Sequence, residues 1–136
     1  MAGERIDTEG TEHGGELPPE RLAEMLESGE VELIDVRRPH EWEAGRIPGA
    51  RRVEVNDLPA EAAKLDRDRP VVLYCRSGSR SELAADGLLA GGFDAHALAG
   101  GITAWVEEGR PLEPEDGYVA ESGEAAALLE ARRRNT

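Results

Sequence analysis

A four-residue apolar run in the middle of the chain, Val71-Val72-Leu73-Tyr74, constrains the fold most strongly. The run is short, rich in β-branched and aromatic residues, and preceded by Arg69-Pro70, which predicts a strand buried on both faces. Other short apolar runs alternate along the chain with segments of helical periodicity, an order that helical crossovers between parallel strands produce. The sequence therefore predicts an α/β fold with a mostly parallel central sheet and helices on both faces.

Caps, turns and chain breakers indicate where the other elements begin and end. Strands are expected at residues 31–36, 52–55 and 93–98, in addition to 71–74. Helices are expected from Pro18-Pro19 to Gly29, after a cap at Asn56 or Asp57, from Arg80 to Gly91-Gly92, and at residues 102–107, with a short helix after residues 37–41.

The chain has 136 residues, which suits one packed domain. Residues 1–16 contain almost nothing apolar, so we expect a disordered acidic leader there. Residues 17–112 are expected to form the domain. Residues 113–136 are expected to be an acidic linker followed by a helix from Ser122. Whether this helix docks on the domain is left open by the sequence.

Composition excludes several classes of function. The net charge of −13 disfavours a nucleic-acid partner, because carboxylates repel phosphate backbones. No apolar run approaches the length that spans a bilayer, so a membrane protein is not expected, and the N-terminus lacks the apolar core of a secretory signal. We therefore expect a cytoplasmic location. The three histidines share no ligand spacing, so no metal site is expected.

The single cysteine of the chain, Cys75, lies where the predicted central strand meets a loop, Cys75-Arg76-Ser77-Gly78-Ser79-Arg80, that leads into a helix. Ligands of open α/β sheets bind beyond the carboxyl ends of the strands, which is where this order places the thiol. Loop amides and the start of the helix can converge there into an anion cradle. We expect this setting, with Arg76 and Arg80, to lower the pKa of Cys75 and to attract a dianionic substrate.

Four segments in this order resemble the signatures of the rhodanese-like family, and the resemblance covers nearly all of residues 17–112. They are Leu33-Ile34-Asp35-Val36-Arg37, Glu41-Trp42-Glu43-Ala44-Gly45-Arg46-Ile47-Pro48-Gly49-Ala50, the loop from Cys75 to Arg80, and Leu98-Ala99-Gly100-Gly101-Ile102-Thr103-Ala104-Trp105 with Gly109-Arg110-Pro111. Arg46 is a departure, because members of the family commonly have histidine there.

The resemblance implies a sulfurtransferase in which Cys75 carries sulfur as a persulfide. The sulfur would come from thiosulfate or a persulfide and pass to a thiol, to cyanide, or to a sulfur-accepting protein, with no cofactor or metal. The loop residues Arg76, Ser77, Gly78, Ser79 and Arg80 would bind the anion. Asp35, Arg37 and Glu41 would support the loop.

Several alternatives stay open from the sequence. Arg80 either faces the bound anion or pairs with Asp35 or Glu41. The domain could instead be a binding or regulatory module, or a persulfide relay without thiosulfate turnover. Cys-based phosphatases and arsenate reductases also place a cysteine and an arginine around an anion loop, but theirs resembles Cys-x-x-x-x-x-Arg, one residue longer than the loop from Cys75 to Arg80.

Overall fold

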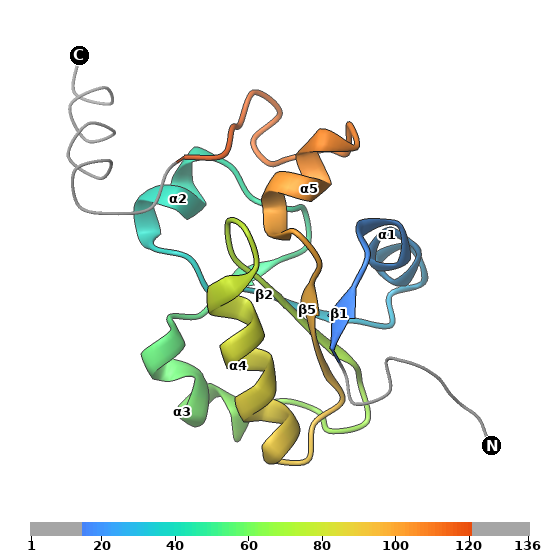
Figure 1. Cartoon of the computed structure of the whole chain (residues 1–136), viewed down its shortest axis with the longest axis vertical. Coiled ribbons are helices and arrows are strands. Elements are labelled where there is room, and N and C mark those ends of the chain that lie inside the picture. The colour runs from blue at the N-terminus through green and yellow to red at the C-terminus, as the bar shows by residue number, and fades with distance from the viewer. Residues whose placement is uncertain (1–14, 121–136) are drawn as a thin grey trace.

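A five-stranded sheet in the order β1-β5-β4-β2-β3 forms the centre of the computed structural model, which describes residues 15–120 (Figure 1). Every strand pairing in it is parallel, as predicted, so the α/β fold class is confirmed. The strands are β1 (Glu16–Leu17), β2 (Glu32–Asp35), β3 (Arg51–Arg52), β4 (Val71–Tyr74) and β5 (Ala95–Leu98). The helices are α1 (Pro19–Ser28), α2 (Pro39–Ala44), α3 (Leu58–Ala62), α4 (Ser79–Ala90) and α5 (Gly101–Glu107), with a 3₁₀ turn at Val55–Asp57.

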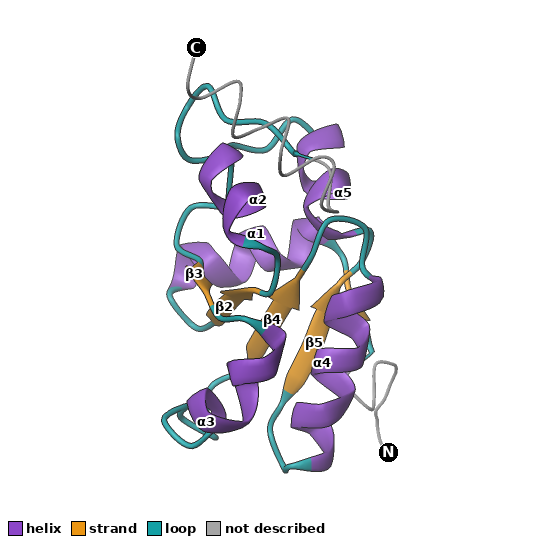
Figure 2. Ribbon diagram, turned by 90° about the vertical axis from the view of Figure 1, so that its left-hand side faces the viewer, coloured by secondary structure: helices purple, strands orange, loops and turns teal. Residues whose placement is uncertain are grey.

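Helices cover the sheet on both faces, with α3 and α4 on one side and α1 and α5 on the other (Figures 1 and 2). Side chains of β4 alternate between these two layers, as the period of a strand requires. Val71 and Leu73 pack toward α3 and α4, and Val72 and Tyr74 pack toward α1 and α5. All four are fully buried, which explains why this strand is the clearest apolar run of the sequence.

The strand β4 lies between β5 and β2. Its carboxyl end therefore lies at the centre of the sheet edge that is formed by the carboxyl ends of the parallel strands. The loop that begins at Cys75 leaves β4 at this edge, and α2 follows β2 beside it. The N-terminus of α5 follows β5 on the other side. Three segments that are distant in sequence therefore meet around Cys75.

The domain begins earlier than the sequence predicts. Glu16 and Leu17 form β1 and pair with Ala97 and Leu98 of β5, and the backbone N–H of Ala97 donates to the carbonyl of Gly15 at 3.0 Å. The prediction that residues 1–16 form a disordered leader is therefore wrong for Glu16. Backbone pairing holds this short strand, and composition carries no signal for it. The rest of the expected leader, residues 1–14, lies outside the described residues.

Residues 113–120, here called the strap, fold back over α2 instead of forming the expected linker. Arg46 and Glu113 exchange two backbone hydrogen bonds of 2.9 and 2.7 Å, and the N–H of Tyr118 donates to the carbonyl of Ala44 at 3.0 Å. The strap ends at Ala120, which is buried. The expectation of a linker is thus wrong for these residues, and the helix expected from Ser122 lies outside the described part of the chain.

Three expected strands are shorter in the structure, and the first of them, β2, runs only from Glu32 to Asp35. Only Arg51–Arg52 form β3. The chain then forms a 3₁₀ helix from Val55, and α3 follows directly from Leu58. The strand β5 begins at Ala95, because Phe93 completes the turn after α4 by donating its N–H to the carbonyl of Leu88. The helix α3 follows the predicted cap region and ends at Ala62.

Candidate active site

The thiol of Cys75 is surrounded by hydrogen-bond donors from the loop and from the first turn of α4. The backbone N–H of Gly78 donates to Cys75 Sγ at 3.0 Å, and Ser81 Oγ lies 3.6 Å from the same sulfur. The Ser81 hydroxyl also lies 3.0 Å from the carbonyl of Gly78. Because a hydroxyl carries one proton, Ser81 donates to one of these acceptors at a time. A negative charge on the sulfur favours donation to Cys75.

These donors decide the protonation of the thiol. Burial raises the pKa of Cys75, but hydrogen bonds from the Ser81 hydroxyl and from the N–H groups of Ser81, Gly78 and Arg80 outweigh burial. The pKa of Cys75 is therefore lowered below its ordinary value, in the direction that the sequence predicts. A lowered pKa increases the fraction of thiolate, which is the reactive form of cysteine.

The N-terminus of α5 holds the loop from behind. The N–H of Ile102 donates to the carbonyl of Cys75 at 2.9 Å, and Thr103 donates to the carbonyl of Arg76 from its N–H at 3.1 Å and its hydroxyl at 2.8 Å. A Cβ at Gly101 would lie 2.5 Å from the Arg76 carbonyl oxygen, so only glycine permits this contact. These bonds fix the carbonyl groups of Cys75 and Arg76 toward α5, while Gly78 directs its N–H at the sulfur.

Arg80 forms an ion pair with Glu41, which is one of the two carboxylate partners that the sequence suggested for it. Its Nη1 and Nη2 donate to the two carboxylate oxygens of Glu41 at 3.1 Å each. Glu41 is fully buried and also accepts the N–H of Arg38 at 3.0 Å. Burial raises the pKa of Glu41, but the bonds from Arg80 and Arg38 outweigh it and lower the pKa. The pair ties the loop to α2.

The other two predicted supporting residues, Asp35 and Arg37, bind each other beneath α2. Arg37 donates to the Asp35 carboxylate from its backbone N–H, Nε and Nη2 at 2.7–3.1 Å. Its Nη2 also donates to the carbonyl of Gly45 at 2.7 Å, at the end of α2. The two side chains are buried, and within residues 15–120 their hydrogen bonds connect them to the end of α2 and not to the sulfur. They position the helix that carries Glu41.

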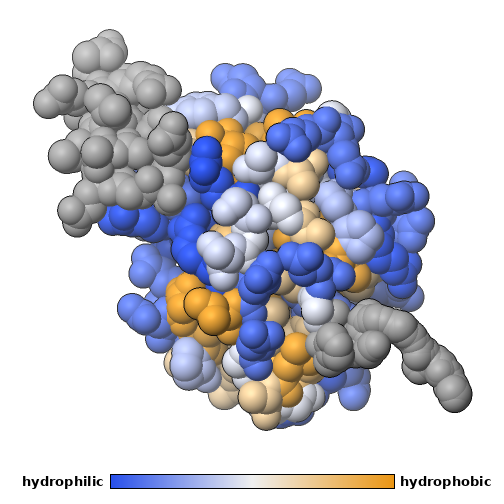
Figure 3. Space-filling view, viewed as in Figure 1, coloured by the Kyte–Doolittle hydropathy of each residue, from blue (hydrophilic) through white to orange (hydrophobic). Residues whose placement is uncertain are grey.

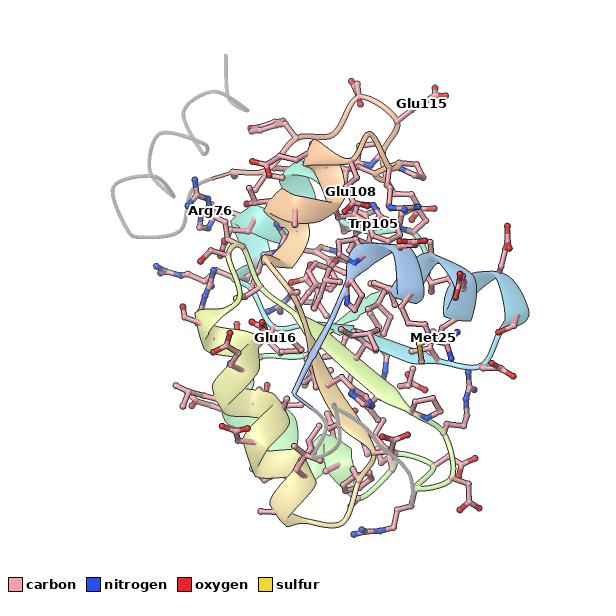
Figure 4. All side chains as sticks on the ribbon, turned by 45° about the vertical axis from the view of Figure 1, so that its right-hand side comes forward. Glu16, Met25, Arg76, Trp105, Glu108 and Glu115 are labelled. Carbon is pink, nitrogen blue, oxygen red and sulfur yellow. The ribbon has the colours of Figure 1, made fainter. Side chains whose placement is uncertain are left out.

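The remaining loop side chains differ in exposure. Ser77 and Ser79 are exposed, and Arg76 is half-buried. Figure 4 shows the Arg76 side chain at the outer tip of the loop, near α5. Its Nε is buried and has no hydrogen-bond partner within residues 15–120. Of the loop arginines, Arg76 is thus the one for which the structure records no carboxylate partner, because Arg80 is paired with Glu41.

Sequence reasoning missed three residues of this arrangement. Ser81 has no role in the sequence-based prediction, yet it lies against the sulfur because it is in the first turn of α4. Gly101 and Thr103 were noted only within a signature, and their contacts to the loop depend on β5 lying beside β4. The usable signal for Ser81 was its spacing of six residues from Cys75 across a short loop into a helix.

The two tryptophans and Arg46 contribute packing. Trp105 is buried, and its Nε1 donates to the carbonyl of Pro111 at 2.7 Å. The guanidinium of Arg46, the residue at which the sequence departs from the family pattern, stacks on the Trp42 ring at 4.8 Å and donates to the Trp42 carbonyl.

Within residues 15–120, no group of three or more His, Cys, Asp and Glu side chains could hold a metal ion. In the same residues, no helix has both the length and the apolar character that a membrane span requires.

Cys75 itself is only 1% exposed and lies at the floor of the loop. A thiol so placed is closed to a bulky group. The amides above it can stabilise charge on that sulfur. The arrangement therefore suits nucleophilic chemistry at one small atom.

Comparison with known proteins agrees with this geometry. The sequence profile of the rhodanese-like domain matches residues 18–108. The chain belongs to the rhodanese-like domain family. This family assignment confirms the resemblance that the four sequence signatures indicated.

Three curated relatives of this rhodanese-like chain carry sulfurtransferase names. A sulfurtransferase of Allochromatium vinosum is 36% identical over 104 residues, which cover 75% of this chain and 97% of that protein. The thiosulfate sulfurtransferase GlpE of Stutzerimonas stutzeri is 36% identical over 90 residues, covering 65% and 82%. The probable adenylyltransferase/sulfurtransferase MoeZ of Mycobacterium tuberculosis is 40% identical over 102 residues, covering 72% of this chain but only 26% of MoeZ. Together they support a rhodanese-like sulfurtransferase.

Solved structures show the same fold. A rhodanese-related protein from Thermoplasma volcanium is 29% identical, with a TM-score of 0.66, covering 71% of this chain and 95% of that chain. A protein from Rhodopseudomonas palustris, described as a possible tyrosine phosphatase, is 28% identical, with a TM-score of 0.66, covering 74% and 85%. The second similarity keeps phosphatase chemistry as the alternative to test.

Proposed function

We propose that this rhodanese-like protein moves sulfane sulfur from thiosulfate or a similar donor to a thiol or cyanide acceptor through a persulfide on Cys75. The observation that carries the proposal is the Cys75 sulfur itself, which accepts the Gly78 N–H and lies beside the Ser81 hydroxyl. Such donors stabilise a sulfur anion both before the reaction and after the sulfur has been passed on.

The reaction has two displacement steps. The Cys75 thiolate attacks the outer sulfur of thiosulfate, a new S–S bond forms, and the old S–S bond breaks with its electron pair leaving on sulfite. An acceptor nucleophile then attacks the outer sulfur of the persulfide, and the Cys75 thiolate leaves. A thiol acceptor gives up its proton to solvent. Neither step requires a redox change or a cofactor, and Asp35 is not needed as an acid.

Each site residue has a separate part in this proposal. The amides of Gly78, Arg80 and Ser81 hold the charge on sulfur. Arg76 attracts the dianionic donor, because its positive charge lies at the tip of the loop. The ion pair of Arg80 with Glu41 holds the loop in place, and Asp35 with Arg37 holds α2.

The location and partners also belong to the proposal. A cytoplasmic location suits a chemistry that needs reduced thiols. MoeZ, whose name joins an adenylyltransferase to a sulfurtransferase, supports a protein as the sulfur acceptor here, in which case the chain acts as a persulfide relay. No membrane or nucleic-acid partner is proposed.

Intact-mass measurement tests the covalent step. Anaerobic incubation with thiosulfate should add one sulfur atom to the protein, cyanide should remove it, and Cys75→Ser should not acquire it. Arg76→Ala should form the same adduct at least tenfold more slowly, and Arg76→Lys should recover much of the rate because it retains the charge. Full thiosulfate turnover by Cys75→Ser would refute the proposal.

The phosphatase alternative is tested with the same protein. The loop from Cys75 to Arg80 is one residue shorter than the phosphatase pattern, so hydrolysis of an aryl phosphate should be far slower than thiosulfate consumption. Faster phosphate hydrolysis would assign the chain to phosphatase chemistry. A protein that acquires sulfur from no donor would instead favour a binding module.

A further inference from the structure

The proposed reaction gives no part to Thr103, which lies in the first turn of α5 and holds the loop of Cys75. Its N–H and its hydroxyl both donate to the carbonyl of Arg76, at 3.1 and 2.8 Å. A carbonyl oxygen has two lone pairs, so these two donors occupy both of them. A single donor would let the peptide group rock about the hydrogen bond, whereas two donors fix its plane. Thr103 thus fixes the orientation of the peptide group between Arg76 and Ser77.

A peptide group that is held by its carbonyl also has a fixed N–H. The peptide bonds of the loop are trans, so each N–H points in the direction opposite to the carbonyl of the preceding residue. The carbonyls of Cys75 and Arg76 both point at α5, where Ile102 and Thr103 donate to them. The N–H groups of Arg76 and Ser77 therefore point away from α5, toward the inside of the loop.

The inside of the loop is also where the sulfur lies. Gly78, farther along the loop, directs its N–H at Cys75 Sγ. In the described part of the chain, the N–H groups of Arg76 and Ser77 have no acceptor, and the buried Nε of Arg76 has no partner. Unpaired N–H groups that converge on one side of a loop bind the oxygen atoms of an anion.

The loop and the start of α5 lie at the surface of the molecule. Ser77 and Ser79 are exposed, and Thr103 is half-buried. In Figure 3 residues of intermediate hydropathy, drawn in white, gather over the loop and the start of α5 at the centre of the face. A small anion from solvent therefore meets the loop directly.

Two classes of sulfur donor differ in the atoms that these N–H groups would contact. In thiosulfate, the sulfur that is attacked is bonded to a sulfonate group, whose oxygens gain charge as sulfite leaves. In an alkyl persulfide, it is bonded to the sulfur of an alkyl thiolate, which carries no oxygen. N–H groups that are directed at oxygens stabilise the departure of sulfite and not that of the thiolate. The orientation of the Ser77 N–H thus affects the choice of donor.

We propose that Thr103 is a positioning residue that makes the site prefer thiosulfate to alkyl persulfides, because it holds the N–H of Ser77 toward the oxygens of the departing sulfite. The inference rests on the proposed function for the sulfur transfer itself. Thr103 acts through the Arg76 carbonyl and does not need to touch the donor. With either donor, the Cys75 thiolate forms the new S–S bond, and the electron pair of the old S–S bond leaves on sulfite or on the alkyl thiolate.

The test compares variants of the full chain with the two classes of donor. Thr103→Val keeps the branched shape and the backbone N–H but removes the hydroxyl, and Thr103→Ser keeps the hydroxyl. Val106→Thr makes the reverse change at an exposed position of the same helix and is the control. Intact mass after timed anaerobic incubation gives the rate of sulfur addition from thiosulfate and from cysteine persulfide.

Thr103→Val should acquire sulfur from thiosulfate about tenfold more slowly than the wild type, because a misdirected donor stabilises the leaving group less well. Its rate with cysteine persulfide should stay close to that of the wild type. Thr103→Ser and Val106→Thr should match the wild type with both donors. The pH midpoint of loading should not move in Thr103→Val, since Thr103 is not among the groups that lower the pKa of Cys75.

A binding measurement tests the orientation of the N–H without any sulfur transfer. Sulfite, which has no sulfur to give, is titrated into isotope-labelled protein while the amide resonances of Arg76 and Ser77 are followed by NMR. In the wild type, the Ser77 amide proton should move downfield as it gains an oxygen acceptor. Thr103→Val should bind sulfite more weakly, and Thr103→Ser should bind it as the wild type does.

Several outcomes would overturn the proposal. Equal slowing of Thr103→Val with both donors would give Thr103 a purely structural role. Unchanged rates in Thr103→Val, or a slow Thr103→Ser, would show that the hydroxyl is not the cause. A Ser77 resonance that sulfite does not move would show that this N–H does not face the anion. If sulfite binding depends on Thr103 while Cys75 acquires sulfur from neither donor, the orientation of the Ser77 N–H by Thr103 stands and the proposed function fails.

Discussion

At Cys75, burial and hydrogen bonding act on the same atom in opposite directions. Burial alone would keep the thiol protonated and unreactive, and the donors of the loop reverse this effect. Among these donors, the Ser81 hydroxyl is a side chain, whereas the others belong to the backbone. Ser81 is therefore the donor that a side-chain substitution can remove.

Replacing Ser81 with alanine should raise the pKa of Cys75. The hydroxyl stabilises the thiolate, so its loss shifts thiolate formation, and with it sulfur loading, to higher pH. Titration of the ultraviolet thiolate absorbance should show the shift, with Cys75→Ser as the blank.

The same change should alter the pH dependence of stability. Because the folded pKa of Cys75 is lowered, the thiolate stabilises the folded state above the pKa of the unfolded thiol, and this contribution is lost as pH falls through the folded value. The advantage of the wild type over Ser81→Ala should thus be larger at alkaline pH than at neutral pH. A titration midpoint that Ser81→Ala leaves unchanged would show that the backbone donors suffice.

At the scale of elements, the shortest strand gives a sharp test of where the domain begins. Deleting residues 1–14 should leave the melting temperature and sulfur loading unchanged. Deleting residues 1–17 removes β1 and its hydrogen bonds to β5, from Ala97 to Gly15 and from Ala99 to Leu17. Each such bond contributes about 1 kcal/mol, so the melting temperature should fall by several degrees.

Calorimetry of the two deletions side by side provides the control, since both lose the same acidic segment. The composition of residues 1–16 predicts that their removal is harmless, but the structure places Glu16 in β1. Equal melting temperatures for the two deletions would show that β1 adds nothing to the stability of the sheet.

The sequence predicted the elements whose signals are local. The apolar run of β4 gave the central strand, and Pro19 and Gly29 marked the ends of α1, where Gly29 is left-handed with φ 75°. The loop from Cys75 to Arg80 also follows from its own residues. Local signals were sufficient there because each residue's conformation depends on near neighbours.

What the sequence did not predict depends on contacts between distant segments. Glu41 is an ordinary acidic residue in sequence, and its choice as the partner of Arg80, 39 positions away, is set by α2 lying beside the loop. The strap follows the backbone of Ala44 to Arg46, and such pairing leaves no mark on side-chain composition. Contacts between distant segments thus explain why the sequence left the partner of Arg80 open and why it wrongly predicted a linker at residues 113–120.

At the scale of the whole molecule, the net charge of −13 sets the response to salt. Like charges repel most strongly when the chain is compact, so screening them stabilises the folded state. The Debye length falls from about 30 Å at 0.01 M salt to about 8 Å at 0.15 M. Sodium chloride over this range should raise the melting temperature by a few degrees.

Scanning calorimetry at fixed pH measures this effect, and potassium chloride should reproduce it because screening depends on ionic strength and not on the ion. The exposed ion pairs, such as that of Arg21 with Glu24, contribute little and should not reverse the trend. A melting temperature that falls with added salt would mean that these attractive pairs dominate the surface electrostatics.

The burial of Cys75 has a further consequence, for the regiochemistry of the proposed persulfide. A persulfide offers an acceptor two electrophilic sulfur atoms, and attack on the inner one would release hydrosulfide and leave the acceptor joined to the protein. The outer sulfur lies about 2.05 Å farther along the S–S bond than Sγ, toward the mouth of the loop. With Cys75 only 1% exposed, a nucleophile from solvent meets the outer atom first and cannot align behind the inner one. The depth of one side chain thus separates productive transfer from self-inactivation.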